Sequence, residues 1–253
     1  MAVHTPDQAY YDHFEHDGWH LGLMNEILRG QISTERGLVA DLRRKEEARF
    51  LLLGSATVRN LDNMAIMDRI LRPGKGKQDD VYIIDRVRYP LTKHVAHAEW
   101  LDEWHKNQTK PLGNGLLYPH FMFAQADMRQ LPLPADTIDC VISDYTLNFL
   151  QDPADVCTTL GEVRRVLKDD GTFIASIGGN PDWPSGKQVP AEHAHSDNRL
   201  TMPAGPELSR LPITTYLRMA AEAKLHIANG VFSGQDMLSG IFKTTVQKLE
   251  AFQ

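Results

Sequence analysis

The chain has 253 residues, of which 42% are hydrophobic and 24% are charged. These proportions are typical of a soluble globular protein with one large domain, or one domain and a small cap. The 33 acidic and 27 basic residues give a net charge of −6 without a block of like charge. This balance argues against nucleic acid as the main partner, because phosphate binding requires a basic face.

The cysteines and the hydrophobic segments give no sign of export. Cys140 and Cys157 fall in a predicted strand and a predicted helix, where free thiols in a reducing compartment are expected. No apolar run reaches the ~18 residues of a membrane span, and the first residues lack the pattern of a signal peptide. We therefore expect a cytoplasmic protein that does not bind membranes.

Residues 1–48 are predicted to form helices separated by turns, because short apolar stripes alternate with glycines. His13, His16 and His20 share one face of such a helix. Histidines in this arrangement can bind one metal ion or form a polar surface. Because Gly18 weakens the helix, the polar surface is favoured and no metal is predicted.

Two buried strands are predicted next. Arg49–Gly54 is the first, and Val81–Asp85 is the second and ends on a carboxylate. Between them, Leu61–Leu71 has the spacing of an amphipathic helix, and residues 72–78 form a loop rich in glycine and lysine. This loop does not bind phosphate, because no strand precedes it and no Lys-Ser/Thr pair follows it.

Leu91–His105 is predicted to be a helix with an apolar side. It carries several histidine and tryptophan rings as well. Contact with a substrate and coverage of the sheet edge both remain open for this segment.

The middle of the chain has the pattern of parallel strands joined by a helix. Phe121–Asp127, Ile138–Asp144 and Thr172–Ile177 are short apolar runs, and the first two end on an acid. Pro153–Lys168 has helical spacing, and Gly171 is expected to end this helix in a left-handed conformation. Such units build doubly wound α/β sheets, whose ligands bind beyond the carboxyl ends of the strands.

The last part of the chain begins with a long polar loop, residues 178–212, which we expect to be a substrate lid. Thr214–Lys224 is predicted to be a helix, and Leu225–Phe232 and residues 241–248 are predicted to be strands. The final strand alternates apolar and polar residues, which is typical of an antiparallel strand.

Three segments, Ala126–Pro134, Thr137–Ser143 and Glu162–Gly171, resemble the second half of the class I S-adenosylmethionine-dependent methyltransferases. The resemblance covers residues 48–180. It implies a Rossmann-like α/β fold, with a mostly parallel sheet that ends in an antiparallel strand. It also implies an N-terminal helical cap (residues 1–48), a methyltransferase domain (residues 49–253) and the cofactor S-adenosyl-L-methionine.

In that family the first strand leads into a glycine-rich turn that an acid precedes. Here Leu52 replaces the acid, Ala56 and Val58 replace glycines, and only Gly54 remains. Each added Cβ occupies space that lets the backbone approach the ligand. The segment is similar to a glycine-poor variant of the family, in which Thr57 and the neighbouring backbone supply the missing contacts.

The resemblance implies the following cofactor contacts: Gly54, Ser55, Ala56, Thr57, Asp85, Asp127, Met128, Asp144 and Tyr11. Asp85 can accept the ribose hydroxyls, and a solvated strand-end aspartate is the alternative. Asp127 can accept the adenine amine while Met128 packs on the ring. Tyr11 would lie over the cofactor, and ordinary packing is equally compatible with it.

Asp144 and Tyr145 are the candidates for catalytic residues, because the family places this position near the methionine end of the cofactor or the acceptor. The N-cap of a following helix is an equally suitable role for Asp144. Methyl transfer is a direct displacement that mainly requires alignment of the reacting groups. A base is required only if the acceptor loses its proton in that step.

We therefore predict a methyltransferase that acts on an oxygen or nitrogen atom of a small molecule. Nucleic-acid bases are disfavoured, because no Asn-Pro-Pro-Tyr type signature follows Ile138–Asp144. The glycine-poor turn suggests one alternative, a non-catalytic methyltransferase-like binding or partner protein. A nicotinamide-dependent dehydrogenase is another, disfavoured by the order of the strand-end acids. The sequence leaves the acceptor and self-association into a homodimer open.

Overall fold

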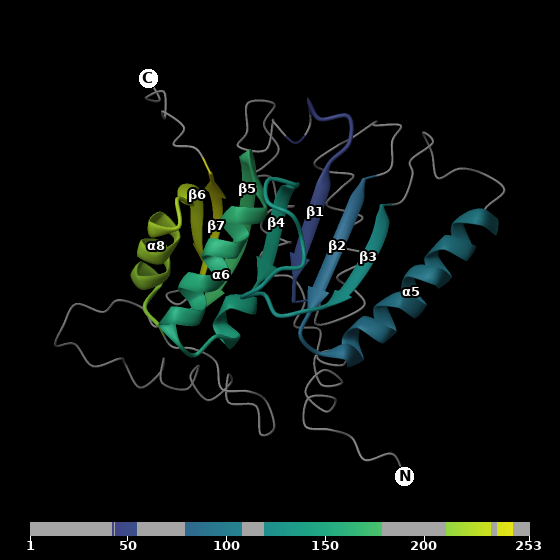
Figure 1. The fold of residues 1–253 in the computed structure, drawn as a ribbon, viewed down its shortest axis with the longest axis horizontal. Coiled ribbons are helices and arrows are strands. Elements are labelled where there is room, and N and C mark those ends of the chain that lie inside the picture. Colours follow the sequence, from purple (N-terminus) through teal and green to yellow (C-terminus); the bar gives the residue numbers. More distant parts are fainter. Residues whose placement is uncertain are drawn as a thin grey trace, which may run out of the picture.

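Figure 1 shows the chain as a computed structural model, which describes residues 42, 44–54, 79–107, 119–178, 211–233 and 237–244. The described residues form a seven-stranded sheet in the order β3-β2-β1-β4-β5-β7-β6. The strands are Arg49–Leu53 (β1), Asp80–Asp85 (β2), His120–Gln125 (β3), Ile138–Asp144 (β4), Leu167–Gly178 (β5), His226–Ser233 (β6) and Met237–Lys243 (β7). Strands β1 to β5 pair in parallel, whereas β7 runs antiparallel to both β5 and β6.

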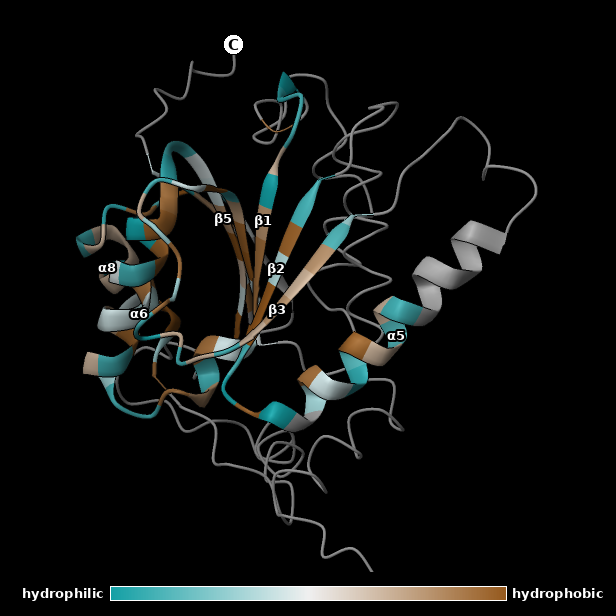
Figure 2. Ribbon diagram, turned by 45° about the vertical axis from the view of Figure 1, so that its right-hand side comes forward, coloured by the Kyte–Doolittle hydropathy of each residue, from teal (hydrophilic) through white to brown (hydrophobic). Residues whose placement is uncertain are grey.

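The central strands are apolar on both faces because both faces are covered, as is usual for parallel sheets. In β1, Leu51 and Leu53 pack into the core on one face, and Phe50 and Leu52 pack into the core on the other. The hydropathy colours of Figure 2 show the same concentration of apolar residues along the sheet.

The helices that the structure describes lie on both faces of this sheet. Pro153–Val166 (α6) and Ile213–Glu222 (α8) bury apolar side chains in one core. Arg88–Asn107 (α5) contributes Leu91 to the core of the opposite face and lies beside the edge strand β3 (Figure 1). The described part of α5 therefore covers the edge of the sheet at β3.

The start of α6 shows how the sequence fixes a helix boundary. The Asp152 side chain caps the helix by accepting a hydrogen bond from the Ala154 backbone N at 2.8 Å. Pro153 occupies the first position, where its missing N–H costs no hydrogen bond. The helix then connects β4 to the parallel strand β5, as the predicted doubly wound fold requires.

The predicted fold class is confirmed, and two local predictions are wrong. Helix α6 ends at Val166 and β5 begins at Leu167, so Gly171 lies inside a strand and does not end the helix. A Cβ at Gly171 would lie 2.8 Å from the Lys168 carbonyl oxygen, so this glycine permits a close approach and has no positive φ. Strand β7 begins at Met237, before the predicted start, because Ile241 pairs with Ile174 well inside the β5–β7 ladder.

Several predictions lie outside the described residues. They are most of the N-terminal cap with its histidines, Tyr11, the turn residues Ser55, Ala56 and Thr57, the helix 61–71, the loop 72–78 and nearly all of the lid. None of the described helices combines the length and the apolar character needed to cross a membrane.

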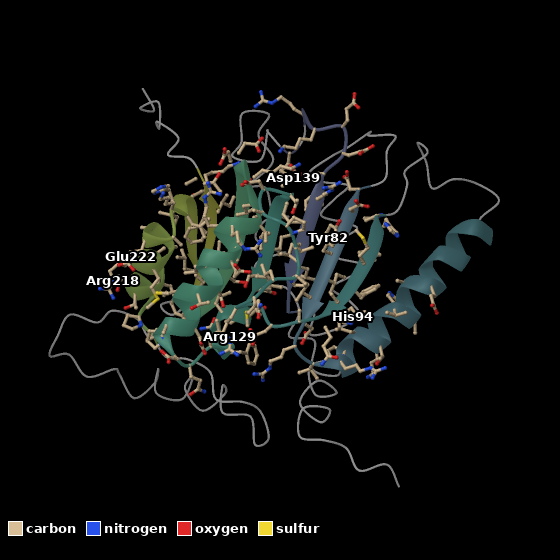
Figure 3. The ribbon with its side chains drawn as sticks, viewed as in Figure 1. Tyr82, His94, Arg129, Asp139, Arg218 and Glu222 are labelled. Atoms are coloured by element: carbon tan, nitrogen blue, oxygen red, sulfur yellow. The ribbon has the colours of Figure 1, made fainter. Side chains whose placement is uncertain are left out.

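A buried ionic cluster lies where β4 begins. Asp139 is 1% exposed, and its carboxylate accepts hydrogen bonds from Lys45 Nζ at 2.5 Å and Lys168 Nζ at 2.8 Å. The Arg49 backbone N donates to the same carboxylate at 2.9 Å. Burial alone would raise the pKa of Asp139, but these donors hold it below its usual value. Figure 3 shows Asp139 at the opposite end of the sheet from Arg129.

Candidate functional site

The backbone turns sharply where β1 ends. Gly54 has a φ of +72°, in the left-handed region that favours glycine. Its N donates to the Ile84 carbonyl oxygen at 2.9 Å, and a Cβ added there would lie 2.4 Å from Thr146 Oγ1. Thr146 Oγ1 itself donates to the Leu53 carbonyl oxygen at 2.7 Å. The ends of β1 and β4 are therefore packed directly against each other.

Asp85 is the last residue of β2 and is 6% exposed. Its Oδ1 accepts a hydrogen bond from the Val87 backbone N at 2.8 Å. The alternative of a solvated strand-end aspartate is therefore wrong. Asp85 is a buried carboxylate whose orientation is fixed from the following turn.

Asp127 follows β3 by two residues and is held by an arginine. Its Oδ1 accepts from the Arg129 backbone N at 2.9 Å and from Arg129 Nε at 3.0 Å. Its Oδ2 accepts from Arg129 Nη2 at 2.6 Å and from Nε at 3.1 Å. Arg129 Nη1 reaches Asp155 on the first turn of α6 at 2.9 Å. The hydrogen bonds from the Arg129 side chain keep the pKa of Asp127 below its usual value.

This geometry fixes the orientation of Asp127. A carboxylate has about four lone-pair sites, and Arg129 makes two hydrogen bonds to each oxygen, with its Nε shared between Oδ1 and Oδ2. Met128, the next residue, is partly buried against the core below α6.

A second ion pair fixes the segment between Asp127 and β4. Glu162 on α6 accepts from the Leu131 backbone N at 2.8 Å and from Arg165 Nε at 2.6 Å. Arg165 in turn donates to the carbonyl oxygens of Leu131 at 3.0 Å and Leu133 at 2.8 Å. Helix α6 thus sets the path of the chain that carries Asp127.

Asp144 is the last residue of β4, and its carboxylate is hydrogen-bonded by the Ser176 hydroxyl of the neighbouring strand β5. Burial raises the pKa of Asp144, and the bond from Ser176 opposes this shift. Among the described residues no cation lies within ion-pair distance of Asp144, in contrast to Asp127 and Asp139. The N-cap alternative is wrong: the 3₁₀ helix Thr146–Phe149 (η2) begins after Tyr145 and has no side-chain cap.

The backbone of Tyr145 is strained. This residue has a φ of +54°, which is uncommon for a non-glycine residue. A Cβ at Gly178 would lie 2.9 Å from Tyr145 Cε1, so the ring lies against the end of β5. The Asn148 side chain accepts from Gly178 N at 3.0 Å and donates to the Gly178 carbonyl oxygen. Tyr145 is therefore held between the exits of β4 and β5.

The three predicted acids lie at one edge of the sheet, at the carboxyl ends of adjacent or nearly adjacent parallel strands. By strand alternation, Asp85 and Asp144 share the face of Ile83 and Ile142. Sequence reasoning missed Arg129 and Ser176. The contact of Arg129 with Asp127 could have been predicted from their spacing in the sequence. Ser176 becomes a neighbour of Asp144 only through the β4–β5 register.

The comparisons with known proteins agree with this fold. A family model described as a methyltransferase domain matches residues 91–175. The resemblance to class I methyltransferases that the sequence indicated is thereby confirmed, together with the Rossmann-like sheet.

The similar proteins are distant. A SAM-dependent methyltransferase from Methanosarcina mazei has a TM-score of 0.53 and 14% identity, over 81% of this chain and 96% of its own. A chain from a complex of the Haloferax volcanii Trm112 methyltransferase activator and a methyltransferase has a TM-score of 0.55 and 15% identity, over 97% and 99% of the two chains. An uncharacterized 37.1 kDa protein in transposon TN4556 of Streptomyces fradiae is 41% identical over 59 residues, which are 23% of this chain and 15% of that protein.

Proposed function

We propose that this protein is an S-adenosyl-L-methionine-dependent methyltransferase that methylates an oxygen or nitrogen atom of a small molecule in the cytoplasm. One observation carries the proposal: Gly54, Asp85 and Asp127 all lie at the carboxyl edge of a sheet with the strand order and antiparallel ending described above. Ligands of doubly wound sheets bind at this edge.

The described residues fit an adenosyl group. Asp85 is oriented by the Val87 backbone N and would accept the ribose hydroxyls. Asp127 is oriented by Arg129, whose Nε is shared between the two carboxylate oxygens, and would accept from the adenine amine. Met128 would pack on the ring. The left-handed backbone of Gly54 allows the close approach that the methionine part requires. Ser55, Ala56, Thr57 and Tyr11 are proposed contacts on the resemblance alone.

The bound cofactor would supply a methyl group activated by a sulfonium. The protein then has to align the acceptor and, for some acceptors, to take up a proton. Asp144 and Tyr145 are the candidates for this role, because they lie at the exit of β4, next to the turn at Gly54. The acidic net charge supports a small-molecule acceptor in preference to nucleic acid.

Titration of the purified protein with S-adenosylhomocysteine, followed by calorimetry, tests the proposal. We expect micromolar binding, and about tenfold weaker binding by Asp85→Asn because a hydrogen bond to an oriented charged group is lost. Asp136→Asn is the matched control, since Asp136 is exposed and precedes β4 at the other end of the sheet. NAD⁺ should give no heat.

Other results would favour the competing functions. No heat at millimolar S-adenosylhomocysteine would favour the non-catalytic partner protein. Binding of NAD⁺ in its place would favour the dehydrogenase. Light scattering of the same sample reports whether the chain forms a homodimer.

A further inference from the structure

Within the described part of the chain, Asp144 has no charged partner, whereas Asp127 pairs with Arg129. Arg129 neutralises Asp127, whereas Asp144 receives one hydrogen bond, from Ser176, and no described cation contacts it. An isolated carboxylate that is partly withdrawn from water is costly unless a partner is supplied. A bound ligand with a positive charge would be such a partner.

A second polar side chain, Ser239, lies on the far side of Ser176. Ser176 pairs with Asp144 across β4 and β5, and Ser239 pairs with Ser176 across β5 and β7. Side chains of directly paired residues lie on the same face of a sheet, so these three form one polar row across three strands. Ser239 is 8% exposed, and its Oγ has no hydrogen-bond partner among the described residues.

Buried hydroxyls are normally hydrogen-bonded, so a Ser239 Oγ that no described group contacts, next to the hydrogen-bonded Asp144–Ser176 pair, requires an explanation. The row runs from the exit of β4, beside Gly54, towards β7, away from Asp85 at the end of β2 and Asp127 just after β3. It therefore lies on the side of the site that the adenosyl contacts leave unused.

From this arrangement we infer that Asp144, Ser176 and Ser239 form the acceptor subsite, and that the acceptor is an amine bound as its ammonium ion. The inference rests on the proposed methyltransferase function and selects nitrogen over oxygen. Asp144 pairs with the ammonium, Ser239 hydrogen-bonds to it, and Ser176 is a positioning residue that orients the Asp144 carboxylate.

The same carboxylate completes the chemistry. One N–H bond of the ammonium breaks, and its proton passes to an Asp144 oxygen. The nitrogen lone pair then forms a bond to the sulfonium methyl carbon while the carbon–sulfur bond breaks and its electron pair stays on sulfur. The products are an N-methylated ammonium, S-adenosylhomocysteine and one proton on Asp144, which is released to water.

The test uses the complex saturated with S-adenosylhomocysteine, titrated with amines and with alcohols of the same skeleton. Suitable pairs are benzylamine with benzyl alcohol, tyramine with tyrosol, and ethanolamine with ethylene glycol. We expect at least one amine to bind about tenfold more tightly than its alcohol, as a hydrogen-bonded charge pair would give. That amine should also accept label from methyl-labelled S-adenosylmethionine.

Variants of the three residues test whether the preference for the amine comes from them. Asp144→Asn should remove the preference for the amine, Ser239→Ala should weaken amine binding several-fold, and both should bind S-adenosylhomocysteine as the parent does. Ser176→Ala should lower the rate of transfer more than it weakens amine binding, and Asp136→Asn should change nothing.

Two results would overturn the inference. The first is an equal response, or none, to both members of every pair. The second is a loss of more than tenfold in S-adenosylhomocysteine affinity in Asp144→Asn, since Asp144 would then bind the ammonium of the cofactor itself. Failure of the parent protein to bind S-adenosylhomocysteine would instead refute the proposed function.

Discussion

At the scale of single residues, Gly54 shows why one glycine is retained in an otherwise glycine-poor turn. Its φ is positive, and a Cβ there would lie 2.4 Å from the hydroxyl of Thr146. We expect Gly54→Ala to lower the free energy of unfolding by about 3 kcal/mol, through a left-handed backbone cost of about 1–2 kcal/mol and overpacking of similar size. Urea denaturation measures this change.

Gly161 offers the matched control for that substitution. It lies on the exposed side of α6, and a Cβ there would meet nothing within 4 Å. Gly161→Ala should therefore stabilise the protein by about 1 kcal/mol, since alanine is the better helix former. Equal effects of the two substitutions would contradict the role given to Gly54.

Substitution of Asp144 should raise the free energy of unfolding, in contrast to substitution of Gly54. Burial raises its pKa in the folded state, so its charged form destabilises the fold at any pH above that pKa. Asp144→Asn keeps an acceptor for the Ser176 hydroxyl and should raise the free energy of unfolding at pH 8 by about 1 kcal/mol. This gain should disappear as the pH falls through the folded pKa, because the parent carboxyl is then neutral too. Thermal unfolding followed from pH 8 down to pH 3 would show it, with Asp136→Asn unchanged throughout.

The positions of the acids could be predicted from the sequence, but their partners could not. Asp85 and Asp144 end apolar runs, and the rule for parallel sheets places both at the ligand edge. That Asp127 is bound by Arg129, while no cation of the described segments contacts Asp144, depends on side-chain geometry. The pairing of Asp144 with Ser176, 32 residues away, depends on strand register.

At the scale of elements, Arg129 connects the exit of β3 to the start of α6 through Asp127 and Asp155. We expect Arg129→Gln to weaken S-adenosylhomocysteine binding about tenfold, because the Asp127 carboxylate loses its orientation and part of its charge stabilisation. The variant should also discriminate less between this ligand and S-inosylhomocysteine, which has an oxygen in place of the adenine amine. Calorimetry with both ligands measures the two effects.

Asp155→Asn separates the two roles of Arg129, which are the orientation of Asp127 and the attachment of this segment to α6. It removes the contact to α6 but leaves the Arg129–Asp127 pair, so binding should weaken by no more than a few-fold. If Arg129→Gln bound both ligands as tightly as the parent, Asp127 would not be the adenine contact.

The extents of most elements followed from the sequence, and the exceptions have physical causes. Apolar runs bounded by polar residues marked β1, β2 and β4, because a strand covered on both faces has to be apolar throughout. The end of α6 was misplaced at Gly171, since a glycine that permits close backbone approach has the same sequence signal as a helix terminator. The start of β7 was missed because pairing with β5 decides it.

At the scale of the whole molecule, the cluster around Asp139 should control acid stability. The pKa of Asp139 is lower in the folded than in the unfolded protein, so its contribution is complete above the unfolded value of about 3.9 and is lost as the pH falls through the folded value. Asp139→Asn should cost about 3 kcal/mol at pH 7 and much less at pH 2, because it leaves two lysines without their shared partner.

Chemical denaturation across this pH range tests the cluster. Asp170, whose side chain is 56% exposed, is the control: Asp170→Asn removes one ion pair of Lys45 and should cost no more than about 0.5 kcal/mol. A pH-independent loss in Asp139→Asn would mean that packing, and not charge, accounts for its effect.

The distance between the Asp139 cluster and the ligand edge has a practical consequence. A designer could strengthen the amino-terminal end of the strands, for example by improving the contacts of Lys45 and Lys168, without touching any group proposed to meet a ligand. Tolerance to heat and choice of acceptor would then be separately adjustable properties of this protein, since each is controlled from a different end of the same seven strands.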